Sequence, residues 1–211
     1  MKESLHRITQ SINPELNDAL MAPIVLEELK LAISQGKPNK APGEDSIGLE
    51  FYRMGWDKTE LLQIMNIMHS EEPLGAHQAR VLMVCIPKRR YPTRISAYRA
   101  LTLLNSDYKI LARVTTNRLK PILQDIISPQ QYCGIQGTSI FEAVATIRDV
   151  TAYAETSQTP LCVKSHDFQA AFDSISHQYL EETLRAYGFS ELFIRRIMGL
   201  YRNATSEMHI N

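Results

Sequence analysis

The residue with the clearest capacity for chemistry is Asp167, which follows the segment at 160–166 and directly precedes Phe168. We expect residues 160–166 to form a β-strand, which would place the Asp167 carboxylate at its carboxyl end, before a tight turn. A carboxylate there can bind a metal ion beside the backbone carbonyl of Phe168. Mg²⁺ prefers such oxygen ligands when it neutralises charge on a transferring phosphoryl group. Alone, the pattern is weak, because an Asp after a strand is more often a helix cap.

A block of positive charge between Arg80 and Lys120 is the second candidate for a functional site. It contains a single acid, Asp107, although the formal net charge of the whole chain is zero. The rest of the chain is therefore acidic, and the block predicts a localised site for a polyanion or a triphosphate. A basic loop together with a solvated basic helix explains the charge equally well. The cations of the block are Arg80, Lys88, Arg89, Arg90, Arg94, Arg99, Lys109, Arg113, Arg118 and Lys120.

The composition indicates a globular chain of one or two domains. Of its 211 residues, 44% are apolar and 22% are charged, which is enough to build a substantial core. No apolar run has the length of a membrane span, and the first residues lack the apolar segment of a signal peptide. Cys85, Cys133 and Cys162 are widely spaced, which favours a reducing, intracellular compartment. The histidines have no zinc-ligand spacing.

The elements that must position these residues are mainly helical, and the predicted fold class is α+β. Apolar periodicity predicts helices at about 23–36, 59–69, 106–120, 176–187 and 190–201. Asn105 is expected to cap the third of these helices, and Pro121 to bend or restart it. Strands are expected at 80–86 and 100–104, joined by a basic loop at 88–99.

A further helix is predicted after residue 139. Ser139 and Glu142 have the spacing of a capping box, and Ile140, Val144 and Ile147 recur on one side of the helix. We expect these three apolar residues to face the core.

Several segments, in order along the chain, resemble motifs of reverse transcriptases of non-LTR (LINE-type) retrotransposons. Residues 161–173, which contain Asp-Phe-Gln-Ala-Ala-Phe-Asp, resemble the first palm motif of that family. Residues 40–45 are similar to the loop that leads into the fingers, and residues 84–88 to an apolar strand ending in Pro-Lys. The other matching segments are 98–105 (Tyr-Arg-Ala-Leu-Thr-Leu-Leu-Asn), 108–112, 117–119, 131–139, 172–177 and 187–189. Together the matches extend over about residues 24–205.

The resemblance implies roles for the matched palm residues. Asp167 would be a catalytic residue and one of the carboxylates that hold Mg²⁺, and the backbone carbonyl of Phe168 would be a further ligand. Phe172 would pack under the sugar of the incoming nucleotide, where its ring would clash with a 2′-hydroxyl and so select deoxynucleotides. Packing in the core is the alternative role for Phe172.

The resemblance also implies contacts outside the palm. Lys88 and Arg99 match the basic fingers residues that contact the incoming triphosphate. Solvent exposure, or contacts with the phosphates of the template, are their alternative roles. Gln131 and Gly137 lie in a loop that would be near the template strand.

The implied architecture is a partial right-hand polymerase. Fingers would occupy about residues 23–155 and the start of the palm about 156–211, after a linker-like segment at 1–22. The implied cofactor is Mg²⁺, and the implied partners are an RNA template, a DNA primer and deoxynucleoside triphosphates. A nuclear location is implied only by the way such elements work.

The sequence also departs from the family pattern. Lys164 and His166 lie where the family strand is apolar, Ala100 replaces a Pro, and Thr138 replaces an Arg. The chain stops in what resembles the strand at 207–211, and the second palm motif and the Asp-Asp pair are missing. We therefore expect a polymerase truncated before its remaining palm strands and inactive by itself. A non-catalytic RNA-binding module and a non-functional transposon remnant are the alternatives.

Overall fold

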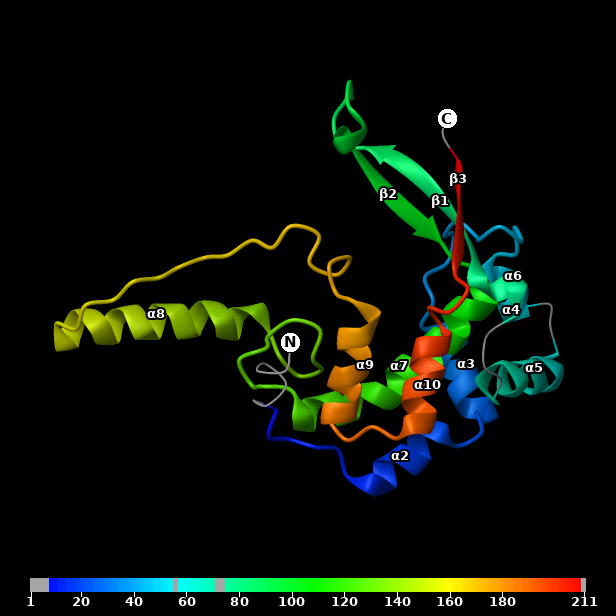
Figure 1. Cartoon of the computed structure of the whole chain (residues 1–211), viewed down its shortest axis with the longest axis horizontal. Helices are drawn as coiled ribbons and strands as arrows, with labels where there is room; N and C mark the ends of the chain where they lie inside the picture. Colours follow the sequence, from blue (N-terminus) through cyan, green and yellow to red (C-terminus); the bar gives the residue numbers. More distant parts are fainter. Residues whose placement is uncertain (1–7, 55–56, 71–74, 210–211) are drawn as a thin grey trace. The chain divides into compact units, whose positions relative to one another are not determined.

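The computed structural model describes residues 8–54, 57–70 and 75–209, and the fold is mixed α and β (Figure 1). The chain divides into two compact units. One comprises residues 17–118 and 190–211, and the other comprises residues 1–16 and 119–189. Two helices contribute to both units: α2 (Pro14–Met21) and α7 (Ser106–Ile126).

The first unit contains a three-stranded sheet of order β2-β1-β3 (Figure 1). The two predicted strands are present as β1 (Arg80–Pro87) and β2 (Tyr98–Leu103), and they form an antiparallel hairpin in which Leu82 pairs with Leu103. Strand β3 (Thr205–His209) pairs in parallel with β1. It begins earlier than the strand expected at 207–211, whose last two residues lie outside the described part of the chain.

The helical elements of the first unit, besides the end of α2, are α3 (Leu26–Ser34), α4 (Leu49–Met54), α5 (Lys58–Ser70), α6 (Ala76–Ala79), the 3₁₀ turn η1 (Ile95–Ala97), the first part of α7 and α10 (Glu191–Gly199). The core consists of buried residues from α3, α4, α5 and α7 and the connection before α3, namely Ile24, Leu29, Ala32, Ile33, Tyr52, Leu61, Met65, Met68, Ile110, Leu111 and Val114. Burial of these side chains is the main favourable term for this unit.

The predicted helices of this unit are confirmed, with changes at their ends. The first begins at Leu26 and not at Pro23. The irregular connection before it ends at Val25, whose N–H donates to the Glu28 carboxylate of the first turn. Helix α7 continues through Pro121 to Ile126. Asn105 does not cap α7 with its side chain, which is instead bonded to other segments.

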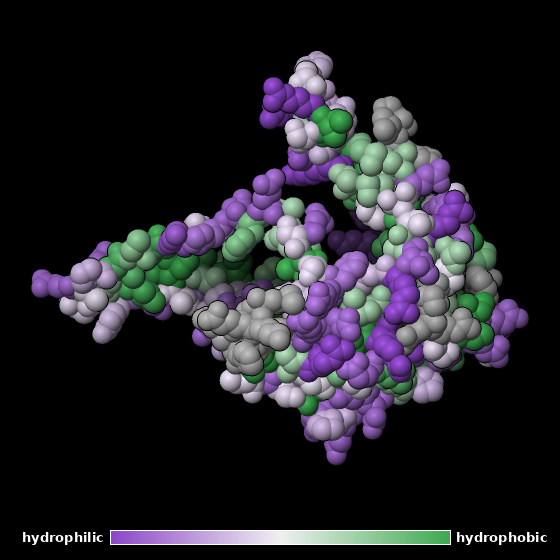
Figure 2. Space-filling model, viewed as in Figure 1, coloured by the Kyte–Doolittle hydropathy of each residue, from purple (hydrophilic) through white to green (hydrophobic). Residues whose placement is uncertain are grey.

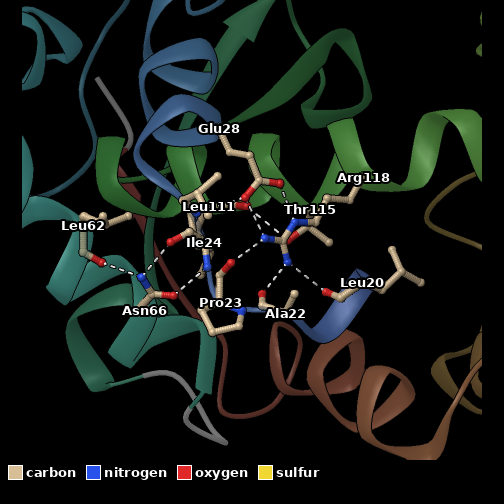
Figure 3. Close-up of polar contacts among 11 residues, drawn as sticks. Leu20, Ala22, Pro23, Ile24, Glu28, Leu62, Asn66, Leu111, Thr115 and Arg118 are labelled. Atoms are coloured by element: carbon tan, nitrogen blue, oxygen red, sulfur yellow. Dashed lines mark hydrogen bonds and ion pairs between the residues drawn. The ribbon is translucent and has the colours of Figure 1, made fainter. Parts of the chain in front are cut away.

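Arg118 joins α7 to the connection between α2 and α3 (Figure 3). Its guanidinium donates to both carboxylate oxygens of Glu28, at 2.7 Å each. It also donates to the backbone carbonyls of Leu20, Ala22 and Pro23, at 3.1, 2.7 and 3.0 Å. The hydrogen bonds from Arg118 to the Glu28 carboxylate hold the pKa of Glu28 below its usual value. Arg118 therefore fixes the path of the chain into α3.

Asn66 holds the same connection from the side of α5 (Figure 3). Its side chain accepts from the N–H of Ile24 at 2.7 Å and donates to the carbonyl of Ile24 at 3.0 Å. Because both backbone groups of Ile24 are satisfied in this way, the residue can be buried outside any helix.

His69, at the end of α5, makes the stability of the first unit depend on pH. It is 4% exposed, and burial, with the charges of Arg196 and Arg118 nearby, lowers its pKa to about 4. The charge of Glu28 acts in the opposite direction and only partly offsets these causes. His69 is therefore neutral in the folded chain at neutral pH.

We predict that stability falls as the pH is lowered from about 6.5 to about 4, because the unfolded chain then binds a proton that folded His69 does not. The slope from this residue is at most about 1.4 kcal/mol per pH unit. Urea unfolding at several pH values should show a flatter profile for His69→Leu. An unchanged slope in His69→Leu would contradict the assignment.

The second unit contains α8 (Ile140–Ser157) and α9 (His177–Ala186). Ser139 caps α8 as predicted, since its hydroxyl accepts from the N–H of Phe141 at 3.2 Å. Helix α9 begins after the cap Ser176 and ends before Gly188, whose φ of +82° suits a glycine. The N–H of Ile12 donates to the carbonyl of Tyr187 at 2.9 Å, which ties the N-terminal segment to this end.

The predicted inner face of α8 is wrong. Ile140, Val144 and Ile147 are 72%, 60% and 56% exposed, and apolar side chains lie on the visible face of this helix (Figure 2). The periodicity identified the helix correctly. An apolar helix face is buried only where another element packs against it. Within the unit of residues 1–16 and 119–189, the described segments do not cover this face.

The predicted strand at 160–166 is also wrong. These residues have no regular secondary structure and are exposed. A strand needs a neighbour that satisfies its backbone N–H and C=O groups. In the described part of the chain the sheet consists of β1, β2 and β3, all of which belong to the other unit.

Candidate nucleotide and template site

The loop that precedes α4 is fastened to the junction of β2 and α7. Asn105, 1% exposed, donates to the carbonyl of His77 at 3.2 Å and accepts from the N–H of Asp45 at 3.4 Å. Ser106 donates from its hydroxyl to the carbonyl of Ile47 at 2.7 Å. The segments at 40–45 and 98–105, which are far apart in sequence, are therefore held together at the base of the β1–β2 hairpin.

Gly43 makes this contact possible. A Cβ atom at this position would lie 2.5 Å from the backbone nitrogen of Asn105 and 2.7 Å from the carbonyl carbon of Leu104. Contacts this short with backbone atoms exclude any side chain, so the loop can approach the junction only with a glycine here.

Lys88 and Arg99 lie on the same hairpin. Arg99 pairs with Ile86 in the register of β1 and β2, and Lys88 follows directly after β1. The backbone N–H of Lys88 donates to the carbonyl of Ala97 at 2.8 Å, and its ammonium donates to the carbonyl of Ser96 at 3.0 Å. Both side chains are exposed, so each can meet an anionic ligand.

Asp167 lies in the exposed, irregular segment that precedes α9. The ring of Phe168 stacks on that of His166, with the ring centres 6.4 Å apart. Phe172 is 93% exposed, so in this structure it is not a core residue. A turn follows, in which the N–H of Ser174 donates to the carbonyl of Ala170 at 3.0 Å. Asp167 is therefore accessible, but it is not at the end of a strand.

Gln131 and Gly137 lie in the exposed loop between α7 and α8. The Gln131 amide donates to the carbonyl of Cys133 at 2.9 Å, and Gly137 has a φ of +84°. Thr138 closes the loop, because its hydroxyl contacts the carbonyls of Tyr132 and Ile135 at 3.0 and 2.9 Å. The Thr that replaces the family's Arg is thus a local structural residue.

The predicted site residues fall into two groups. Lys88 and Arg99 belong to the first unit, whereas Asp167, Phe168, Phe172, Gln131 and Gly137 belong to the second. Within the described residues, no group of three or more His, Cys, Asp or Glu side chains is arranged to hold a metal ion. The same part of the chain contains no helix that is long and apolar enough to cross a membrane.

For two residues, the supporting role that the structure shows was not predicted from the sequence. Arg118 and Asn105 occur in the matched segments 117–119 and 98–105, but nothing in their local pattern indicates what their side chains bind. Their partners lie 28–98 residues away in sequence. Only a known contact between these segments reveals such a role.

Comparison with known proteins identifies the family. A family model described as reverse transcriptase (RNA-dependent DNA polymerase) matches residues 86–210. The uncharacterized 149 kDa protein of transposon TX1 from Xenopus laevis is 32% identical over 202 residues, which cover 95% of this chain and 15% of that protein.

Two further relatives are named as parts of mobile elements. The RNA-directed DNA polymerase from mobile element jockey of Drosophila funebris is 33% identical over 118 residues, 53% of this chain and 13% of that protein. The Pol polyprotein from type-1 retrotransposable element R2 of Popillia japonica is 24% identical over 188 residues, with coverages of 89% and 26%. The chain thus spans at most 26% of the length of these relatives. It belongs to the reverse transcriptase family, as a reverse transcriptase domain of the non-LTR, LINE-type retrotransposons.

Proposed function

We propose that this chain supplies nucleotide-binding and template-binding residues of an RNA-directed DNA polymerase. The observation that carries the proposal is the family match over residues 86–210, which includes the hairpin residue Arg99 and the segment around Asp167. The expected partners are an RNA template, a DNA primer and deoxynucleoside triphosphates. As in the sequence-based interpretation, the fingers would occupy about 23–155 and the start of the palm about 156–211 of a partial right hand.

Lys88 and Arg99 would bind the triphosphate of the incoming nucleotide. Both are exposed cations on one hairpin, and their hydrogen bonds with phosphate oxygens would be charge-assisted. The ammonium of Lys88 gives one hydrogen bond to Ser96 and keeps further N–H groups for a ligand. Phe172 would lie under the sugar, and its exposure leaves its ring free to do so.

Asp167 would be a ligand of Mg²⁺, together with the backbone carbonyl of Phe168. The exposed carboxylate is a hard oxygen donor that suits this ion. The described residues bring no cluster of further ligands to it, and the 211 residues contain no Asp-Asp pair. The fit is therefore limited to part of a metal site, and in-line phosphoryl transfer would require further carboxylates. An intracellular location, with work in the nucleus, is part of the same proposal.

Binding of a fluorescent deoxynucleoside triphosphate to the purified 211-residue chain tests the proposal. We predict that the double variant Lys88→Ala, Arg99→Ala binds at least about tenfold more weakly, because both side chains would form charge-assisted hydrogen bonds with the triphosphate. Lys37→Ala, Lys120→Ala, which removes two exposed cations outside the hairpin, serves as the matched control and should change the affinity less than about twofold. Equal affinities of the double variant and the control would refute the assigned roles.

A further inference from the structure

The hairpin tip, which we define as residues 88–97, is the loop that joins β1 to β2 (Figure 1). It carries the hydroxyl of Thr93 among several cations, since Arg89 and Arg90 precede Thr93 and Arg94 follows it. The tip contains no acidic residue. Thr93 and the three arginines are all exposed. An enzyme that modifies hydroxyl groups can therefore reach Thr93.

The spacing between Arg90 and Thr93 is one that a protein kinase can recognise. An arginine-directed kinase, which carries acidic groups beside its active site, selects a hydroxyl by an arginine three residues before it. Five threonines of the chain have an arginine at this spacing. They are Thr93, Thr102, Thr116, Thr151 and Thr205. Of the five, Thr93 alone also has an arginine four residues before it, namely Arg89.

The structure distinguishes Thr93 from the other four threonines. A kinase binds the acceptor segment in extended form, so the segment must first leave any helix or sheet to which it belongs. Thr102 and Thr205 lie in β2 and β3, where they are paired with β1. Thr116 and Thr151 lie in α7 and α8, and their hydroxyls donate to carbonyls of the preceding turn at 2.7 and 2.8 Å. Thr93 has no regular secondary structure, so a kinase can bind it without unfolding the chain.

The hydrogen bonds that close the tip lie at its base. The N–H of Lys88 donates to the carbonyl of Ala97 at 2.8 Å, and its ammonium donates to the carbonyl of Ser96 at 3.0 Å. The N–H of Ala97 donates to the carbonyl of Arg94 at 2.9 Å. These bonds do not involve residues 89–93. The base therefore keeps its shape while a kinase holds the acceptor segment.

A hollow of about 370 Å³ can receive the phosphate once it is attached. Thr93 lines this hollow together with Lys88, Arg89 and Arg94. Within the described residues, neither of the two arginines forms an ion pair with an acid. A phosphothreonine carries about −1.5 to −2 charges at pH 7, and its oxygens accept charge-assisted hydrogen bonds from arginine. The hollow thus supplies the cations that stabilise a phosphate on Thr93.

From this arrangement we infer that Thr93 is a phosphorylation site of an arginine-directed serine/threonine kinase. The Oγ1 atom of Thr93 attacks the γ-phosphorus of ATP, the bond from this phosphorus to the bridging oxygen breaks, and ADP leaves. The hydroxyl proton passes to a base of the kinase. Arg89 and Arg94 then hold the phosphate, whose charge lies beside Lys88 and weakens the binding of a triphosphate there. This last effect rests on the proposed function, whereas the modification itself does not.

The first test measures phosphate incorporation into the folded 211-residue chain by a purified arginine-directed kinase with Mg²⁺ and ATP. Mass spectrometry should find the phosphate on Thr93, at a rate at least about tenfold above that of any other threonine. Arg90→Ala keeps the hydroxyl but should slow the modification at least about tenfold, because the kinase loses a charge-assisted contact. Lys37→Ala, which removes an exposed cation outside the tip, is the control and should leave the rate unchanged.

The same assay can overturn the inference. Equal rates at Thr93 and Thr102 would do so, as would a rate that Arg90→Ala leaves unchanged. A chain that stays unmodified at Thr93, while the kinase phosphorylates a standard peptide in parallel, would also refute the site. Thr93→Val keeps the shape of the side chain and should abolish the incorporation. Circular dichroism would verify that each variant folds.

Phosphorus NMR of the modified chain tests whether the hollow holds the phosphate. The second pKa of a phosphothreonine is about 6, and neighbouring arginines favour the dianion, so this pKa should be about one unit lower in the chain. It should return to its ordinary value in modified Arg89→Ala, Arg94→Ala. A pKa that is the same with and without the two arginines would refute the phosphate contacts.

Binding of the fluorescent deoxynucleoside triphosphate separates this inference from the proposed function. The modified chain should bind the nucleotide at least about tenfold more weakly than the unmodified chain. Equal affinities of the two forms would refute the effect on the triphosphate. Modification at Thr93 in a chain whose unmodified form binds no nucleotide would support the site and refute the proposed function. Tight nucleotide binding that depends on Lys88 and Arg99, without modification at Thr93, would do the reverse.

Discussion

Replacing Arg118 by Ala is expected to lower the free energy of unfolding by about 4 kcal/mol, which is a large part of the stability of a chain of this size. The variant would leave the Glu28 carboxylate without its two guanidinium contacts. It would also leave the backbone carbonyls of Leu20, near the end of α2, and of Ala22 and Pro23, which follow this helix, without the donors that Arg118 provides. Because Arg118 is largely buried, water can replace these contacts only if the connection opens. Urea unfolding followed by circular dichroism measures the change.

Two further variants make the result specific to this geometry. Arg185→Ala removes the exposed ion pair with Glu181 on α9, where the atoms are 3.0 Å apart, and should cost less than about 0.5 kcal/mol. Arg118→Lys keeps the charge but loses the planar fork that reaches both carboxylate oxygens, so it should still cost about 2 kcal/mol. A decrease in the free energy of unfolding of less than about 1 kcal/mol in Arg118→Ala would show that the contacts of Arg118 contribute little to stability.

Gly43→Ala is expected to lower the free energy of unfolding by about 3 kcal/mol. The added methyl group would overlap backbone atoms of Leu104 and Asn105, and backbone atoms cannot rotate away as a side chain can. The loop at 40–46 would have to withdraw from the junction of β2 and α7. The hydrogen bonds of Asn105 and Ser106 to this loop and to its continuation at Ile47 would then weaken. Chemical denaturation measures the loss.

Gly48→Ala is the control for this prediction. A Cβ atom there meets only the carboxylate of Glu50, the far end of a flexible side chain, at 2.8 Å. The expected cost is below about 1 kcal/mol, since Glu50 can change its rotamer. If Gly43→Ala proved no more harmful than Gly48→Ala, the close approach at the hairpin base would not be a stabilising contact.

Features that depend on neighbouring residues could be predicted from the sequence. Ser139 caps α8, Gly188 follows the end of α9, and the apolar run at 80–86 forms β1, because capping, left-handed backbone and strand preference are local properties. The buried face of α5, with Leu61, Met65 and Met68, was also predictable. Its apolar residues repeat with the period of a helix, and a core was present to receive them.

Features that depend on a distant partner could not be predicted in this way. The periodicity of Ile140, Val144 and Ile147 does not reveal whether another element covers them, and in the structure they are exposed. The apolar residues at 160–166 favour a strand, yet the segment stays irregular, because a strand requires a neighbour for its hydrogen bonds. Asn105 looked like a helix cap, but its amide binds His77 and Asp45, residues remote in sequence.

The family could be identified without a structure, because ordered motifs such as that around Asp167 consist of residue types and spacings that are recognised without any knowledge of contacts. The residues that carry charge near the hairpin are likewise evident from the sequence. How that charge is presented depends on the fold: pairing of β1 with β2 brings Lys88 back onto Ser96 and leaves Arg89, Arg90 and Arg94 exposed. The physical reason is that composition sets the chemistry of a side chain, whereas hydrogen bonding and close packing with distant segments set its direction and exposure.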